Sequence, residues 1–118
     1  MPELPEVETI ARKLRPVLIG QTILQAEVLW PGCLVGLSAE EFDAQISGQR
    51  IEGISRRAKY LDLQLTTLHL LIHLRMSGDL TIQNAATQPA RHDRLIVELA
   101  NQRCLVFNDP RKFGRDPG

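Results

Sequence analysis

Alternation between apolar and polar residues in the second half of the chain predicts a series of β-strands. The pattern is clearest over residues 59–65 and 68–76, and shorter runs follow at 79–83, 94–100 and 103–107. A period of two places successive side chains on opposite faces of a sheet. Short strands separated by turns are typical of an antiparallel sandwich or barrel.

The N-terminal segment has the spacing of a helix instead. Its apolar positions recur every three or four residues and form one stripe: Val7, Ile10, Ala11, Leu14 and Leu18. Pro5 suits the first helical position, and Glu6 and Glu8 suit the positive end of the helix dipole. Pro16 should end or kink this helix, and Gly20 should close the segment.

The residues between this helix and the sheet predict a strand, a turn and a second helix. The strand is expected over 22–29 and the turn at Trp30-Pro31-Gly32. Ser38, with Glu41 three residues later, forms the pattern that begins a helix. We therefore expect one α+β domain over residues 1–118, an antiparallel β-sandwich flanked by two helices.

Composition agrees with one globular domain and adds a charge asymmetry. Of the 118 residues, 43% are hydrophobic, no apolar run reaches membrane-spanning length, and no signal peptide is recognisable, which favours the cytoplasm. The net charge is zero, but residues 1–50 hold four Lys/Arg against seven Asp/Glu, whereas residues 51–118 hold ten against seven. The excess collects in three clusters, at 56–59, 91–94 and 111–115, which indicate a phosphate-binding face. Cys33 and Cys104 form no metal-binding pattern, so we expect free thiols and no cofactor in this chain.

The opening MPELPEVET permits catalysis by the chain terminus. If Met1 is removed, Pro2 carries a secondary amine with a pKa near 8, of which roughly 10% is unprotonated at pH 7. Such an amine can condense with an aldehyde to give an iminium ion, which is a strong electron sink. The adjacent Glu3 could act as general acid and base. The alternative is that these residues only lead into the helix.

Two further segments carry candidate chemistry. Lys59 shares the alternation of Leu61, so it is expected to begin the core-facing side of its strand, where burial would lower its pKa. The alternative is a strand-end lysine that reaches water. In NDPRKFG, Arg111 and Phe113 should lie on one side of an extended loop, suited to phosphate contact and base insertion. Met76 is a second candidate wedge, although both apolar residues could equally pack in the core.

Four motifs together resemble one family. MPELPEVET, RRAKYL (56–61), HLRMSGDL (73–80) and DPRKFG (109–114) occur in the order found in the N-terminal domain of formamidopyrimidine-DNA glycosylases, bacterial enzymes that repair 8-oxoguanine. The resemblance covers nearly the whole chain. PELPE also separates it from the endonuclease VIII branch, whose opening resembles PEGPE.

The resemblance implies a role for each candidate residue. Pro2 would attack C1′ of the damaged nucleoside, Glu3 would move protons at the sugar, and Glu6 would position the site. Lys59 would contact phosphate and assist base processing. The DNA-binding set would be Met76, His92, Arg111, Lys112 and Phe113. Of these, Met76, Arg111 and Phe113 would fill the gap left by the flipped base.

The chain also departs from the family pattern. Lys112 stands where arginine is more frequent, and Arg75 stands where glycine is frequent. The family's helix–two-turns–helix domain and its zinc finger, where zinc is expected, are absent from residues 1–118. The resemblance implies glycosylase and AP-lyase activity of a monomer on damaged double-stranded DNA, weak or absent in this fragment alone. The alternatives are a non-enzymatic damaged-DNA-binding module and an N-terminal-proline tautomerase, a class that lacks RRAKYL and DPRKFG.

Overall fold

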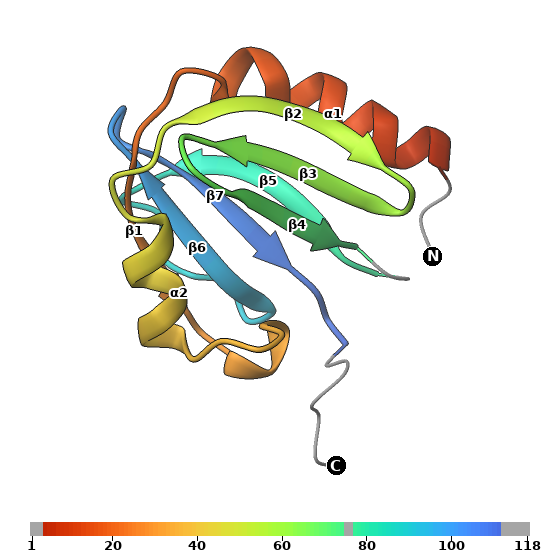
Figure 1. Cartoon of the computed structure of the whole chain (residues 1–118). Helices are drawn as coiled ribbons and strands as arrows, with labels where there is room; N and C mark the ends of the chain where they lie inside the picture. Colours follow the sequence, from red (N-terminus) through yellow and green to blue (C-terminus); the bar gives the residue numbers. More distant parts are fainter. Residues whose placement is uncertain (1–3, 75–76, 112–118) are drawn as a thin grey trace.

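The computed structural model describes residues 4–74 and 77–111, which form two antiparallel sheets with two helices beside them (Figure 1). In chain order the elements are α1 (Leu4–Leu18), β1 (Ile23–Val28), a 3₁₀ turn (Pro31–Cys33), α2 (Ala39–Ile46), β2 (Ile51–Arg57), β3 (Tyr60–Leu65), β4 (His69–His73), β5 (Asp79–Asn84), β6 (Asp93–Leu99) and β7 (Arg103–Asn108). The predicted sandwich flanked by two helices is confirmed. No helix of the described residues is long and apolar enough to cross a membrane.

The two sheets divide the chain unevenly. One has four strands in the order β1-β6-β7-β5, and the other has three in the order β2-β3-β4. All neighbouring strands are antiparallel. Helix α1 packs along β2 and α2 packs along β1, so each sheet has one helix against it.

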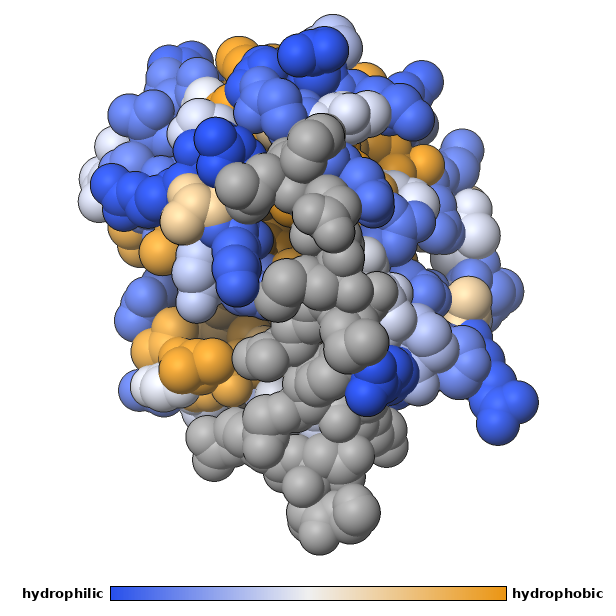
Figure 2. Space-filling view, turned by 90° about the vertical axis from the view of Figure 1, so that its right-hand side faces the viewer, coloured by the Kyte–Doolittle hydropathy of each residue, from blue (hydrophilic) through white to orange (hydrophobic). Residues whose placement is uncertain are grey.

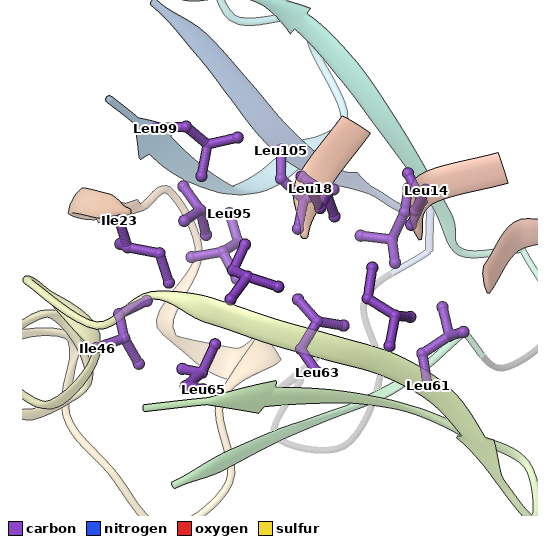
Figure 3. Close-up of a cluster of buried hydrophobic side chains, with 14 of the residues drawn as sticks. Leu14, Leu18, Ile23, Ile46, Leu61, Leu63, Leu65, Leu95, Leu99 and Leu105 are labelled. Carbon is purple, nitrogen blue, oxygen red and sulfur yellow. The ribbon is translucent and has the colours of Figure 1, made fainter. Parts of the chain in front are cut away.

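Leucine and isoleucine side chains from both sheets and both helices form the core (Figure 3). Leu61, Leu63 and Leu65 of β3 are 0–3% exposed, as the alternation predicted. Leu14 and Leu18 of α1 reach into the same cluster. Burying each such side chain contributes roughly 1.5–3 kcal/mol, so the core holds the two sheets together and positions the loops at their ends.

The sequence predicted that Pro16 ends or kinks helix α1; the helix does not end there but continues to Leu18. Two interactions hold its last turns: Arg15 Nε donates to the Ile54 carbonyl at 2.7 Å, and the Arg15 guanidinium lies 3.5 Å from Glu8. Leu18 is 0% exposed. Proline removes only one helical donor, and the burial of Leu18 outweighs that loss.

Helix α2 begins as predicted. The Ser38 hydroxyl accepts the Glu41 N–H at 3.1 Å, and the Glu41 carboxylate accepts the Ser38 N–H at 2.8 Å. This reciprocal pair is a capping box. It lowers the pKa of Glu41, mainly through the Ser38 backbone hydrogen bond to the ionised carboxylate.

Asp62 departs from the predicted alternation because it faces away from the core yet is only 6% exposed. Two neighbours on the outer face of the three-stranded sheet cover it. His69 Nδ1 lies 2.8 Å from one carboxylate oxygen, and Arg57 Nε lies 4.0 Å from the other. A polar position on a sheet can thus be buried by longer side chains on adjacent strands.

Candidate nucleic-acid interface

Three strand ends and the start of α1 meet at one end of the sandwich. The register places Arg57 opposite Tyr60 and Tyr60 opposite His73, so the β2–β3 turn and the end of β4 lie together. Helix α1 runs antiparallel to β2, which brings its first turn beside the β2–β3 turn (Figure 1).

The four-stranded sheet contributes three more strand ends. Asn108, the last residue of β7, lies opposite both Asp79 of β5 and Asp93 of β6. The β4–β5 connection therefore links the two sheets at this same end, and the segment after β7 leaves from it. Figure 2 views this side of the molecule, and hydrophilic residues cover most of its described surface. We call this region the basic end.

Exposed charge at the basic end is predominantly positive. Among residues 4–74 and 77–111, the exposed cationic residues here are Arg56, Arg57, Lys59, Arg91 and Arg111, and the exposed acidic ones are Glu6 and Asp79. Cations held on loops around one surface suit a phosphate backbone, whose contacts position a nucleic acid without reading its sequence. The described residues of the three basic clusters thus lie at one end of the fold.

Lys59 does not begin the core-facing side of its strand; that prediction was wrong. The chain reverses in a two-residue turn, Ala58–Lys59, and alternation starts only at Tyr60. Ala58 has a φ of 54°, and its carbonyl accepts a hydrogen bond from Arg56 at 3.1 Å. Lys59 is exposed, which is the strand-end alternative. An ammonium at the tip of a hairpin can reach phosphates on a bound duplex.

Glu6 lies in the first turn of α1 with its side chain exposed, while the adjacent Val7 is only 2% exposed. Val7 thus anchors the start of the helix and leaves the carboxylate of Glu6 in solvent. Pro2 and Glu3 precede this turn and lie outside the described residues, as do Met76, Lys112 and Phe113.

His92 and Arg111 lie at the basic end and are joined through Asp109. The Asp109 N–H donates to the His92 carbonyl at 3.0 Å, and the Arg111 N–H donates to Asp109 Oδ1 at 2.9 Å. His92 is half-buried and Arg111 is exposed. Sequence reasoning placed Arg111 in a loop that contacts phosphate but did not identify the Asp109 carboxylate that organises this loop.

Arg94 is a second residue that sequence reasoning missed. It is 8% exposed, and its Nε donates to the Asp109 carbonyl at 2.8 Å. Its guanidinium lies 5.7 Å from the centre of the Trp30 ring, a cation–π geometry. In the basic cluster 91–94, Arg91 is therefore an exposed cation, whereas Arg94 is buried and has a structural role. The local sequence pattern does not distinguish these two arginines, because the burial of Arg94 depends on packing against the chain at the end of β7.

The cysteines are free thiols, as expected. Cys104 is buried and Cys33 half-buried. Burial raises the pKa of Cys33 to about 11, and burial also raises that of Cys104, with nearby Glu98 and Asp93 acting in the same direction. Within residues 4–74 and 77–111, His, Cys, Asp and Glu side chains form no group of three that could hold a metal ion.

A hollow of about 250 Å³ lies on the four-stranded sheet, and Asp93 of the basic end is among its lining residues. The 85–89 loop and strand residues line it, and its charged lining is acidic: Glu27, Asp93 and Glu98. Negative charge disfavours a phosphate backbone, so the hollow is not the nucleic-acid site.

Fold and site together define the class: an α+β domain of two antiparallel sheets that presents loops from both as one cationic surface, of the kind that suits a phosphate backbone. Comparison with known proteins then gives the family. The profile of the formamidopyrimidine-DNA glycosylase N-terminal domain matches residues 1–115. The chain belongs to the formamidopyrimidine-DNA glycosylase family.

Relatives of known function and solved structures support this family assignment. The formamidopyrimidine-DNA glycosylase of Chloroflexus aurantiacus is 54% identical over 117 residues, which are 98% of this chain and 42% of that protein. That of Exiguobacterium sp. is 42% identical over 97% of this chain and 42% of its own length. The chain thus spans less than half the length of these relatives.

The similar structures were solved with DNA. The Lactococcus lactis Fpg in complex with DNA containing an abasic site has a TM-score of 0.89 and 36% identity, covering 95% of this chain and 42% of that one. The complex of the same enzyme with FAPY-dG-containing DNA has a TM-score of 0.88 and 37% identity, covering 94% and 42%.

Proposed function

We propose that this chain is the catalytic N-terminal domain of a base-excision repair DNA glycosylase that acts on oxidised purines and then cleaves the abasic site. The observation that carries the proposal is the meeting of the exposed basic loops with the first turn of α1, a few residues after Pro2. Related structures contain DNA with an abasic site or FAPY-dG. We also propose that it works as a monomer in the cytoplasm.

Pro2 would be the nucleophile once Met1 is removed. Its amine lone pair attacks C1′ of the damaged nucleoside, and the electrons of the breaking C1′–N bond leave with the base, which takes up a proton. The amine proton is lost as the sugar ring opens, which leaves an iminium ion between Pro2 and C1′. Loss of a C2′ proton then expels the 3′ phosphate by β-elimination, and water releases Pro2.

Glu3 and Glu6 would assist this chemistry. Glu3 adjoins Pro2 in the chain and would move protons at the sugar. Glu6 would help to position the nucleophile from the first turn of α1, where its carboxylate faces solvent. Lys59, exposed at the β2–β3 turn, would contact a phosphate and approach the damaged base from there.

The remaining predicted residues would hold the deformed duplex. His92, Arg111 and Lys112 would contact phosphates, and Met76 and Phe113 would enter the stack together with Arg111. Unstacking a base costs a few kcal/mol, which residues that occupy the vacated space offset.

A direct test measures release of 8-oxoguanine and strand cleavage. The substrate is a duplex with one 8-oxoguanine, and the protein is this chain with Met1 removed, confirmed by mass spectrometry. Free base and a nicked strand in equal amounts are the expected products, with chain retaining Met1 as the inactive control. Tight binding to the lesion without either product would instead support the non-enzymatic damaged-DNA-binding module.

A further inference from the structure

One buried carboxylate joins two segments of the basic end that are far apart in the sequence. Asp109 is 3% exposed. Its Oδ1 accepts the Ser77 hydroxyl at 2.5 Å and the Arg111 N–H at 2.9 Å. Ser77 belongs to the connection between the two sheets, whereas Arg111 belongs to the segment that follows β7. A single oxygen atom therefore holds both.

The backbone of Asp109 is itself held on both sides. Its N–H donates to the His92 carbonyl, and its carbonyl accepts from Arg94 Nε. The Arg94 carbonyl in turn accepts the N–H groups of Leu29 and Trp30 at 2.9 and 3.3 Å. The carboxylate thus projects from a backbone anchored to β6 and is a fixed point rather than a mobile side chain.

The Ser77 side of this junction is equally constrained. The Gly78 N–H donates to the Leu74 carbonyl at 2.8 Å, which closes a tight turn. A Cβ on Gly78 would lie 2.4 Å from that carbonyl oxygen and 3.0 Å from the Phe107 ring. Only glycine fits at position 78 without displacing the backbone, so the chain next to Ser77 is constrained.

We infer that Asp109 is a positioning residue that couples Ser77 to Arg111, so that Ser77, just before β5, and residues 109–111, just after β7, meet DNA as one unit. Its use on DNA rests on the function proposed above; the coupling itself does not. Burying a carboxylate is costly unless it is hydrogen-bonded, and bonds to an ionised acceptor are short and strong. The 2.5 Å contact with Ser77 has that character.

Asp93 provides a matched control. It is 4% exposed and also accepts two hydrogen bonds, from the Ala90 N–H at 2.7 Å and from Asn108 Nδ2 at 2.9 Å. Neither partner is Ser77 or Arg111. Removal of its carboxylate measures the general cost of losing a buried aspartate at this end of the fold.

The coupling is tested without DNA by amide hydrogen exchange of the full chain, followed by NMR. Ser77→Ala should speed exchange of the Arg111 amide, and Asp109→Ala that of the Gly78 amide, each about tenfold, as expected when one charge-assisted bond is removed. Asp109→Asn, whose amide oxygen can accept both bonds, should stay near wild type. Asp93→Ala should speed the exchange of both amides only by as much as its effect on the global free energy of unfolding accounts for. An Arg111 amide unaffected by Ser77→Ala would overturn the coupling.

Its use on DNA is tested by the ratio of dissociation constants for an intact duplex and a duplex with one abasic site. Ser77→Ala and Asp109→Ala should lower this preference about tenfold, whereas Asp109→Asn and Asp93→Ala should retain it. If hydrogen exchange shows the coupling but the variants keep the wild-type preference for the abasic duplex, the DNA role of Asp109 would be overturned. A wild-type chain without any preference would count against the proposed function and the DNA role together, while hydrogen exchange still decides the coupling.

Discussion

At the scale of single residues, buried polar groups give the basic end its shape. Within the described parts of the chain, the buried charged side chains are Asp62, Asp93, Arg94 and Asp109. The last three lie at the basic end, and each has a hydrogen-bond partner there. Because burial without a partner is costly, these groups position loops rather than meet a ligand, and the exposed cations are left for phosphate contact.

The Cys33 thiol gives a prediction at this scale. Burial raises its pKa to about 11, so at pH 8 the reactive thiolate should be roughly a hundredfold rarer than in an ordinary cysteine. Iodoacetamide labelling of the native chain at pH 8, followed by mass spectrometry, should therefore be slow on Cys33, and the raised pKa of Cys104 should slow its labelling too. Labelling of the urea-unfolded chain is the control. Fast labelling of native Cys33 at pH 8 would contradict the burial described here.

Lys59 and Asp62 show what residue patterns miss. Strict alternation predicts a core-facing Lys59 and a solvent-exposed Asp62. The turn at Ala58–Lys59 interrupts the alternation at the first position, and Arg57 and His69 cover the second. Turn placement and cross-strand cover depend on the partner strand, which the local sequence does not contain. The cationic surface at residues 56–59, by contrast, was predictable from the sequence, because these side chains are exposed at the tip of a hairpin and no distant segment among the described residues covers them.

At the scale of elements, local signals were sufficient where both partners of a contact are close in the chain. The Ser38–Glu41 capping box and the strand alternation of β3 and β4 are such cases. Pro16 misled because the interactions that carry α1 to Leu18 include a distant one, Arg15 with Ile54. The same limit hid Asp109, whose partner Ser77 is 32 residues away.

The capping box predicts a pH-dependent stability. Ser38→Ala should lower the free energy of unfolding by about 1 kcal/mol at pH 7, the usual effect of removing such a cap. Because the folded-state pKa of Glu41 is lowered, its share of the cap is present above the unfolded-state pKa and is lost as the pH falls through the folded one. Urea unfolding of Ser38→Ala and Glu41→Gln at pH 7 and at pH 3 separates the two halves of the cap. An effect of Glu41→Gln that is the same at both pH values would contradict a role for ionised Glu41.

At the scale of the whole molecule, the fold gives a chain of zero net charge an uneven distribution of positive and negative charge. The basic clusters come together at one end, while the acidic residues Glu27 and Glu98 line a hollow elsewhere on the four-stranded sheet. Sequence counts predicted the asymmetry but not its location, because only the register of both sheets brings the three clusters to one surface. The four motifs identified the family because they occur in order along the chain.

This charge arrangement predicts salt-dependent binding. Replacing Arg56 or Arg57 by alanine should weaken binding to any duplex and reduce the slope of log K against log salt by about 1 for each phosphate that the protein no longer neutralises. Arg12→Ala, an exposed change on α1, is the control and should leave the slope unchanged. Fluorescence anisotropy over a salt series measures it. Equal slopes for Arg57→Ala and Arg12→Ala would place the DNA elsewhere.

The central claim is that the amine of Pro2 forms a covalent link to DNA, and borohydride trapping tests it most directly. The chain with Met1 removed is mixed with a duplex that carries one abasic site, and borohydride reduces any iminium to a stable amine. Digestion and mass spectrometry should then find the sugar remnant on the N-terminal peptide, and protein that retains Met1 should give no adduct. A remnant on the peptide that contains Lys59, or no adduct from protein with a free Pro2 that binds the duplex, would contradict the account.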